Sequence, residues 1–441
     1  MLMESPAFIK RLFARAPVAG SKADRHTRKT VVLCHALLSE RGEASGAALA
    51  REALAAYRLL SGAALRAFFD ILAQEFSPKP EAVEAAAGAY RQDPSQANLI
   101  RLQRVVESPR QELFRRLNLA AGGTAALVEM RRRVLGELRA QTHWAGVDAD
   151  LAHLLGSWFN RGFLTLQRID WRTPALVLEK LMQYEAVHEI QGWRDLRRRL
   201  ESDRRCFAFF HPALPDEPII FIEVALTKGM SDQVQPLLDP DSPVVDPGGA
   251  DTAIFYSITN CQEGLRGISF GNFLIKQVAE DLGREFPRVK TFATLSPIPG
   301  FRRWLAATAD AHPQLSELLG ELATEDWYQR AGPGSRARTE LMRLCAYYLQ
   351  HAKHDREPAD AVARFHLGNG ARMERLNWLA DTSTTGMARS AGMMVNYVYR
   401  LKDVERNHEA YAREHLIVAS AGLSLLARGS MVARLKAARK E

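Results

Sequence analysis

The spacing of apolar residues divides the chain into two parts. Up to about residue 165, apolar residues recur at intervals of three and four, as Leu54, Tyr57 and Leu60 do within the segment 47–76. This interval is the period of an amphipathic helix, and Ser61-Gly62 interrupts the run at a helix boundary. Further helices are predicted over 97–107, 109–119, 124–140 and 148–166. The first part is therefore expected to be a helical bundle.

From about residue 170, short runs dense in Val, Ile, Phe and Tyr replace the helical pattern, as expected for strands. Such runs occupy 206–210, 219–226, 253–259, 290–295, 372–379 and 394–401. The segment 211–218 is turn-rich and predicts a hairpin, and a helix is expected over 271–286. The closing segment is helical. These elements predict a mixed sheet flanked by helices, with domains over 1–168 and 169–441 and a helical insertion at about 301–363.

Composition narrows the class of protein. The chain has 441 residues, of which 47% are hydrophobic and 25% charged, so it has the composition of a globular protein. Its longest uncharged runs are about a dozen residues, whereas a membrane span needs roughly 18, so no membrane segment is expected. The net charge of +8 suits an anionic small molecule, an acidic partner or simple solubility and does not by itself indicate nucleic acid binding. The arginines at 131–133 are most simply explained as a solvated helix face.

The four cysteines lie far apart, without the CxxC spacing of a zinc site. A disulfide scaffold and a metal site are therefore not expected, and a reducing cytoplasm is the predicted location. The N-terminal segment 1–15 is basic and amphipathic but too short for a good targeting sequence. An ordinary first helix explains it better.

A glycine-rich loop between the third strand and its helix is a candidate phosphate site. It matches neither the Rossmann nor the P-loop spacing, but Arg266-Gly267-Ile268-Ser269-Phe270-Gly271 resembles the acyl-CoA loop of GNAT-type N-acetyltransferases. Glycines at 264, 267 and 271 let the backbone approach a ligand, and the following helix directs N–H groups at one spot. Glycines that serve a tight helix entry would give the same pattern. The candidate binding residues are Arg266, Gly267, Ile268, Ser269, Phe270, Gly271 and Asn272.

Two further fragments carry side chains suited to catalysis. Ser296 is followed by two prolines that restrict the turn, and this fragment alone is better explained by a Ser-Pro turn. His366 lies among apolar residues, where a buried structural histidine is the commoner explanation. An ordinary histidine pKa near neutrality would let it exchange a proton at cellular pH. Tyr397 and Tyr399 share one face of a predicted strand, as two packed aromatic residues also would.

Taken together, these fragments resemble the malonyl-CoA decarboxylase family. The matching segments, in chain order, are Tyr184–His188, Arg204–Phe207, Val224–Thr227, Gly264–Gly267, Gly271–Lys276, Arg284–Pro287, Leu295–Phe301, Phe365–Gly370, Asn377–Trp378 and Met394–Tyr397. The strings Ser-Pro-Ile-Pro-Gly-Phe and Phe-His-Leu-Gly-Asn-Gly-Ala are much more specific than the glycine loop.

The resemblance implies a helical domain that forms a homo-oligomer, a dimer or tetramer, followed by an acetyltransferase-like catalytic domain. It implies conversion of malonyl-CoA to acetyl-CoA and CO₂ without metal, biotin or ATP. The family's serine and histidine correspond to Ser296 and His366, and a family tyrosine corresponds to Tyr399. Where family members carry an acidic residue, this chain has Ser269, so the role of that position is open.

The chemistry of decarboxylation agrees with these assignments. Loss of CO₂ from a malonyl thioester leaves negative charge on C2 and on the thioester oxygen, so the thioester serves as the electron sink. The protein must orient the carboxylate, donate to the enolate oxygen and protonate C2. His366 is expected to donate the proton or stabilise the enolate, Ser296 to orient the malonyl group, and Tyr399 to support both. Lys276, Arg302 and Arg303 are candidates for the 3′-phosphate of CoA or plain surface charge.

Two other classes of function remain open. A GNAT-like acyltransferase would use the same loop but needs a site for an acceptor. A helical interaction protein, such as a nucleic-acid binder, would rest on the basic helical part and would show salt-sensitive binding without any reaction.

Overall fold

The computed structural model describes residues 22–438 except 41, 269, 271–273, 313–314 and 325. The expected N-terminal helix over 1–15 therefore lies outside the described residues. The chain divides into two compact units. The first comprises the described residues up to 165 together with 210–217 and 262–270, and the second comprises 166–209, 218–261 and the described residues from 271 onward. Two short segments of the mixed part thus belong with the helices.

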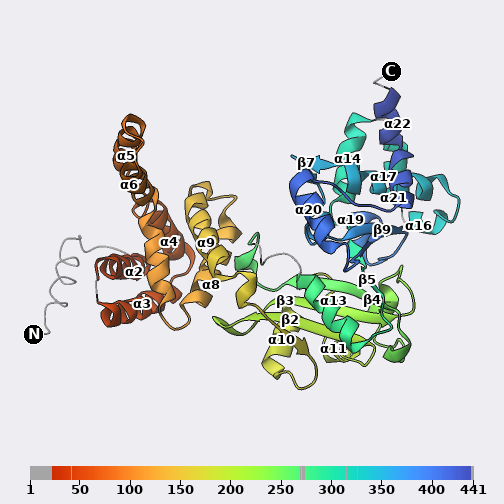
Figure 1. Cartoon of the computed structure of the whole chain (residues 1–441), viewed down its shortest axis with the longest axis horizontal. Coiled ribbons are helices and arrows are strands. Elements are labelled where there is room, and N and C mark those ends of the chain that lie inside the picture. The colour runs from red at the N-terminus through yellow and green to blue at the C-terminus, as the bar shows by residue number, and fades with distance from the viewer. Residues whose placement is uncertain are drawn as a thin grey trace, which may run out of the picture. The chain divides into compact units, whose positions relative to one another are not determined.

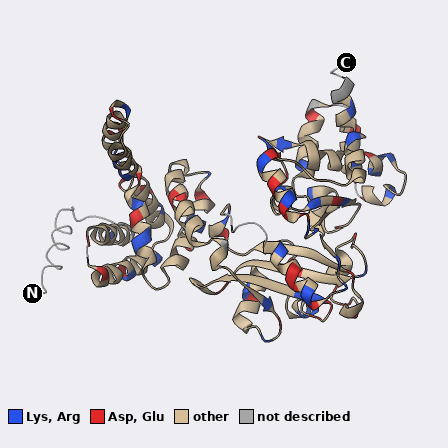
Figure 2. Ribbon diagram, viewed as in Figure 1, with Lys and Arg blue, Asp and Glu red and all other residues tan. Residues whose placement is uncertain are grey.

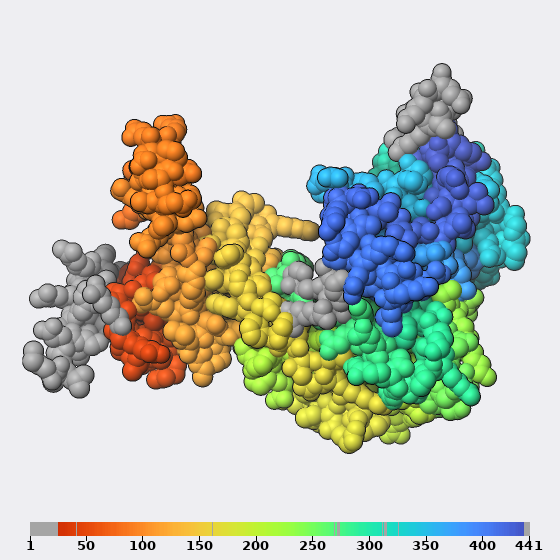
Figure 3. All heavy atoms as spheres, viewed as in Figure 1, coloured from red at the N-terminus to blue at the C-terminus, as the bar shows by residue number. Residues whose placement is uncertain are grey.

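The first unit is helical, as predicted (Figure 1). Its helices are α2 (Lys22–Ser39), α3 (Glu43–Arg58), α4 (Gly62–Gln74), α5 (Pro80–Gln92), α6 (Gln96–Val106), α7 (Pro109–Asn118), α8 (Gly123–Glu137) and α9 (Ala145–Trp158). Prolines occupy the first turns of α5 and α7, where a missing N–H costs nothing. The apolar positions of the helical pattern form the core, in which Phe69 packs against Trp144 at 5.1 Å between ring centroids. In Figure 3, α5 and α6, in orange, project from the other helices of this unit.

The second unit is built on an eight-stranded sheet in the order β1-β2-β3-β4-β5-β10-β6, with β9 paired to β10. The strands are β1 (Thr165–Ile169), β2 (Arg204–His211), β3 (Leu214–Thr227), β4 (Thr252–Asn260), β5 (Thr291–Thr294), β6 (Ser296–Pro297), β9 (Arg372–Asn377) and β10 (Met394–Val398). The predicted strands are confirmed to within a few residues. β1 was not predicted. The helix expected over 148–166 overlaps its first two residues, and no apolar run marks this edge strand, in which only Ile169 is buried.

The glycine loop lies in the connection between two parallel strands at the centre of the sheet. β4 and β5 are parallel, with Thr252 opposite Thr291, and α13 (Leu274–Glu285) connects them. Its apolar side is buried, whereas charges of both signs cover its outer side (Figure 2). The predicted fold class, a helical part followed by a mixed sheet flanked by helices, is confirmed.

The second unit contains further helices besides α13. They are α10 (Ala175–Tyr184), α11 (Trp193–Arg199), α12 (Gln235–Leu238), α14 (Phe301–Ala311), α15 (Ser316–Leu322), α16 (Trp327–Arg330), α17 (Arg336–His351), α18 (Ala361–Gly368), α19 (Thr384–Ser390), α20 (Val404–Glu414), α21 (Ala421–Arg428) and α22 (Met431–Ala438). A small hairpin, β7 (Lys353–His354) with β8 (Glu357–Pro358), interrupts the predicted helical insertion. Among the residues with a described structure, no helix combines the length and apolar content of a bilayer span.

His366 lies in the last turn of α18, between the helical insertion predicted at about 301–363 and the strand predicted over 372–379. Asp360 caps this helix by accepting the N–H of Ala363, and Gly370, with φ of +79°, turns the chain into β9.

Candidate active site

Ser296 lies where the central strand β5 gives way to the two-residue strand β6. Ser296 pairs with Val395 of β10, and Leu295 donates its N–H to the carbonyl of Phe255 in β4 at 3.0 Å. The following proline-rich turn ends at Gly300, where a Cβ atom would lie 2.1 Å from the hydroxyl of Tyr348. The serine is thus held by the sheet on one side and by a tightly packed turn on the other, and its side chain is buried.

The structure brings together the three residues predicted to be catalytic. His366 Nε2 lies 3.0 Å from Ser296 Oγ, and His366 Nδ1 lies 2.8 Å from the hydroxyl of Tyr399. All three belong to the second unit, although they come from β6, α18 and the residue after β10. They are at most 5% exposed. A hydroxyl, an imidazole and a phenol therefore form one buried hydrogen-bonded chain.

Burial determines the protonation states of this chain. Desolvation lowers the pKa of His366 to about 3 and raises the pKa of Tyr399 well above its ordinary value. The imidazole is consequently neutral and the phenol protonated at neutral pH. The sequence-based expectation of a histidine pKa near neutrality is wrong for the free protein, because it did not allow for complete burial.

Two neighbours of the Ser296–His366 pair were not predicted to belong to the site. The ring of Tyr397 stacks on the imidazole of His366, with centroids 4.5 Å apart and an interplanar angle of 26°. Thr294, which is fully buried, accepts a hydrogen bond from the Ser296 hydroxyl at 2.8 Å. The period-two spacing of Tyr397 and Tyr399 was the available signal for the stacked ring. A threonine ending an apolar strand gave no comparable signal.

The described part of the glycine loop has the features of an exposed backbone ligand site. Arg266 and Gly267 are exposed, Ile268 is half-buried and Phe270 is buried. Gly267 has φ of +79°, in the left-handed region that favours glycine, and no atom lies within 4 Å of a Cβ built on it. Ser269, Gly271 and Asn272 lie outside the described residues.

Gly264 has a different role from the one predicted. A Cβ atom on it would lie 2.0 Å from the carbonyl oxygen of Val128 in α8, so this glycine is required by packing between the loop and the helix. Both residues belong to the first unit. The residue therefore permits a close approach of two backbones and does not itself present an open face to a ligand.

Arg131 of α8 is not on the solvated face assigned to it. Its side chain is buried, pairs with Asp148 at 2.8 Å and donates to the carbonyls of Gly264 and Arg266, both at 2.9 Å. The neighbouring Arg132 does lie on the exposed face and bonds to Glu129. The helical pattern missed Arg131 because two of its three partners are backbone carbonyls more than 130 residues away. This arginine anchors the glycine loop to the helical unit.

The three cations considered for the 3′-phosphate differ in availability. Lys276 pairs with Glu405 at 2.6 Å and lies 3.8 Å from Glu280. Arg302 is half-buried, and this burial lowers its pKa. Arg303 is exposed. Within the described part of the chain, no group of three His, Cys, Asp or Glu side chains could hold a metal ion.

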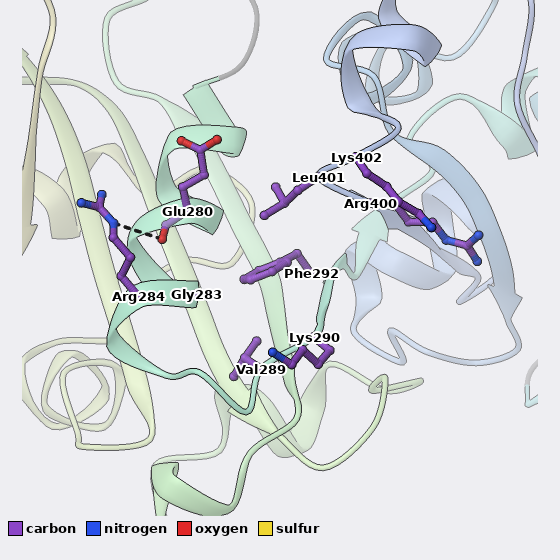
Figure 4. Close-up of a pocket in the computed structure, with 9 residues that line it drawn as sticks. All are labelled: Glu280, Gly283, Arg284, Val289, Lys290, Phe292, Arg400, Leu401 and Lys402. Atoms are coloured by element: carbon purple, nitrogen blue, oxygen red, sulfur yellow. Dashed lines mark hydrogen bonds between the residues drawn. The ribbon is translucent and has the colours of Figure 1, made fainter.

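An open pocket of about 990 Å³ lies beside the C-terminal end of α13 and contains none of the predicted site residues (Figure 4). Phe292, Val289 and Leu401 give it an apolar lining. Its cations do not gather at one point: the side chain of Arg284 lies on the opposite side of the pocket from those of Arg400 and Lys402, and Lys290 lies between them. The pocket therefore lacks the convergent polar groups of a built ligand site.

Comparisons with known proteins agree with this geometry. The model of the malonyl-CoA decarboxylase C-terminal domain matches residues 162–437, and that of the N-terminal domain matches residues 76–159. The chain belongs to the malonyl-CoA decarboxylase family.

Its relatives in the malonyl-CoA decarboxylase family include animal and bacterial proteins. The mitochondrial malonyl-CoA decarboxylase of Anser anser anser is 39% identical over 338 residues, which cover 70% of this chain and 67% of the relative. That of Rattus norvegicus is 36% identical, with 70% and 69% covered. The crystal structure of malonyl-CoA decarboxylase from Rhodopseudomonas palustris superposes with a TM-score of 0.87 at 49% identity, covering 92% of this chain and 99% of that one. The structure from Agrobacterium vitis gives 0.84 at 49% identity, with 90% and 99% covered.

Proposed function

We propose that this protein converts malonyl-CoA to acetyl-CoA and CO₂, and that Ser296, His366 and Tyr399 are its catalytic residues. The observation that carries the proposal is the buried hydrogen-bonded chain Ser296–His366–Tyr399 in a member of the malonyl-CoA decarboxylase family. A chain of this kind supplies a hydrogen-bond donor in a site from which water is excluded. Such a donor acts most strongly on charge that develops during the reaction.

His366 is the donor to the developing enolate. Since the imidazole is neutral at rest, it stabilises the enolate oxygen by hydrogen bonding, in the manner of a neutral histidine electrophile. Ser296 orients the malonyl carboxylate beside the thioester. Tyr399 bonds the far nitrogen of the ring and so holds the imidazole in place.

The reaction consumes one proton, because a carboxylate leaves as CO₂ and C2 becomes a methyl group. A neutral His366 cannot hold that proton in the free protein. The enolate that remains when CO₂ leaves brings negative charge next to the ring and raises the pKa of the imidazole, so the ring takes up the proton after the carbon–carbon bond has broken. The imidazolium then transfers this proton to C2 and returns to its neutral state.

The CoA part of the substrate binds at the glycine loop. Of the predicted residues, the backbone N–H groups of Gly267, Ser269, Phe270, Gly271 and Asn272 bind the pyrophosphate. Those of Arg266 and Ile268 already donate to the carbonyls of Glu263 and Leu265, so these two residues contribute by shaping the loop. The exposed backbone of Gly267 in its left-handed conformation supports this assignment. Of the three cations, Arg302 and Arg303 are the stronger candidates for the 3′-phosphate, because Lys276 is already paired with Glu405.

We further propose that the reaction needs no metal, biotin or ATP, since the thioester accepts the electrons of the breaking bond. Malonyl-CoA and acetyl-CoA are the ligands, with no nucleic acid or membrane partner. The helical unit forms a homo-oligomer, a dimer or tetramer. The cytoplasm is the proposed location, in agreement with four buried cysteines that lie far apart in the sequence without CxxC spacing.

Two single variants test the proposal. His366→Ala and Ser296→Ala each lose a group that acts on the developing charge, and we expect kcat to fall by at least about a hundredfold. Acetyl-CoA affinity, measured by calorimetry, should change little because the glycine loop is untouched. Wild-type turnover in both variants would refute the assignment of Ser296 and His366 as catalytic residues.

A further inference from the structure

The hydrogen-bonded chain of the active site continues beyond the serine to Thr294. The Ser296 hydroxyl donates to Thr294 Oγ1 at 2.8 Å. The backbone N–H of Tyr397 donates to the same oxygen at 3.2 Å. Thr294 itself is completely buried. The threonine oxygen thus receives two hydrogen bonds in a place that water does not reach.

Tyr399, at the other end of this hydrogen-bonded chain, determines in which direction its protons are donated. Burial keeps the hydroxyl of Tyr399 protonated, and His366 Nδ1 is the one hydrogen-bond partner that the described residues give it. Thr294, Ser296, His366 and Tyr399 have one proton each but form only three links, so in either direction the hydroxyl proton at one end has no partner. A phenol is a stronger hydrogen-bond donor than an aliphatic alcohol, so the phenol donates its proton to Nδ1 and the unpaired proton is that of Thr294.

The tautomer of the histidine follows from this. A neutral imidazole carries one ring proton, and a ring nitrogen that accepts a hydrogen bond cannot carry it. The proton is therefore on Nε2, which donates to Ser296 Oγ at 3.0 Å. The serine must direct its own proton elsewhere, and Thr294 Oγ1 is where it goes.

We propose that Thr294 is a positioning residue that accepts the Ser296 proton and thereby holds His366 in the tautomer whose proton lies on Nε2. This inference rests on the proposed function and deepens it. The Nε2 proton is the one that faces the serine and can be offered to the enolate. In a serine hydrolase the hydroxyl donates to the histidine and becomes the nucleophile, so the direction here is reversed. Ser296 is accordingly an orienting hydroxyl in the resting protein.

Thr294 also contributes to the pairing of β5 and β6 with β10, and this structural role is distinct from its proposed role toward Ser296. β5 and β6 share one register with β10, since Ala293 lies opposite Val398 and Ser296 opposite Val395. Between those pairs, the Tyr397 N–H bonds the threonine side chain in place of a backbone carbonyl. Loss of the Thr294 hydroxyl therefore weakens the sheet as well as the hydrogen-bonded chain of the active site. The free energy of unfolding alone does not distinguish the two roles.

The first test uses the unmodified protein. The full chain is labelled with ¹⁵N-histidine, and the His366 signals are identified by their absence from His366→Gln. Protonated and unprotonated ring nitrogens have well-separated ¹⁵N shifts, so the spectrum reports the tautomer directly. We expect Nε2 to be protonated and Nδ1 to be unprotonated in the absence of substrate. The reverse assignment would overturn the inference.

The second test uses variants at Thr294. Thr294→Val keeps the shape but removes the acceptor, so the serine proton turns to His366 and the ring proton moves toward Nδ1. The loss of one hydrogen bond corresponds to a fall in kcat of about five- to tenfold. Thr294→Ser retains the oxygen and should recover turnover to within about threefold, with the parent tautomer. If Thr294→Val does not fold, Thr294→Cys, with a weaker acceptor, should show a partial shift of the tautomer.

A double variant separates positioning from structure. Because Thr294 acts through the serine, Thr294→Val should have no further effect on residual turnover in a Ser296→Ala background. Equal losses with and without the serine would assign Thr294 a purely structural role and overturn the inference. The tautomer is read without turnover. An Nε2-protonated ring in a protein that does not decarboxylate malonyl-CoA would therefore refute the proposed function and leave this inference standing.

Discussion

The buried Arg131 gives the most specific prediction about substrate binding, because it bonds the glycine loop directly although it lies more than 130 residues away in the sequence. Its guanidinium donates to the carbonyls of Gly264 and Arg266, each at 2.9 Å, and pairs with Asp148. In Arg131→Met these bonds are lost while most of the side-chain volume remains. The loop is then anchored by its own short backbone bonds, such as that from the Arg266 N–H to the Glu263 carbonyl at 3.0 Å.

The magnitude follows from the bonds that are lost. A hydrogen bond from a charged donor contributes about 1.5–3 kcal/mol. In the variant, part of the binding free energy is used to order the glycine loop. If this part equals the contribution of one such bond, KM for malonyl-CoA should rise about 10- to 150-fold. Ser296 and His366 are untouched, so kcat should change by less than about threefold. Steady-state kinetics with malonyl-CoA, together with calorimetry of free CoA, measures both quantities.

Arg132→Met is the matched control. Arg132 is the next residue of the same helix, is exposed and bonds to Glu129, so its loss should leave KM within about twofold. Circular dichroism and thermal unfolding establish that both variants fold. An equal rise of KM in the two variants, or a fall in kcat at constant KM in Arg131→Met, would refute the reasoning.

Three further results are expected. Gly267→Val places a β-branched residue at φ of +79° and should weaken CoA binding about tenfold or more by calorimetry, with thermal stability less affected; unchanged affinity would contradict the loop assignment. Gly264→Ala forces a Cβ against the Val128 carbonyl, so thermal unfolding should show a clear loss of stability, and a fully stable variant would refute the packing role. The lowered pKa of His366 makes the folded state bind fewer protons than the unfolded state, so stability is complete above about pH 6.5 and declines as the pH falls toward 3. Relative to His366→Gln, the wild type should lose about 2 kcal/mol of unfolding free energy between pH 7 and pH 5 in denaturant titrations, and parallel pH profiles would contradict the burial argument.

Much of the fold could be predicted because local pattern and tertiary structure agree in this chain. The helical period of residues such as Leu54 and Tyr57 reflects a face that is buried in the structure. The apolar runs of the central strands are continuous because these strands are covered on both faces. Edge strand β1 has no such run and was missed.

The site could be predicted in its parts but not in its electrostatics. Ser296, His366 and Tyr399 stand in specific sequence strings, and the structure brings them within hydrogen-bonding distance. The neutrality of His366 depends on complete burial, which no local fragment reveals. Arg131 escaped prediction for a similar reason: two of its three partners are carbonyls of a distant loop, and carbonyls have no sequence signature.

The central claim is that the protein decarboxylates malonyl-CoA by itself, with the thioester as electron sink. The most direct measurement supplies malonyl-CoA alone, with a metal chelator and without any acyl acceptor, and follows acetyl-CoA and CO₂ together. We predict equimolar formation of both products, at a rate that the chelator does not change. Malonyl-CoA that stays intact until an acceptor is added, and then yields an acylated acceptor without CO₂, would contradict the account.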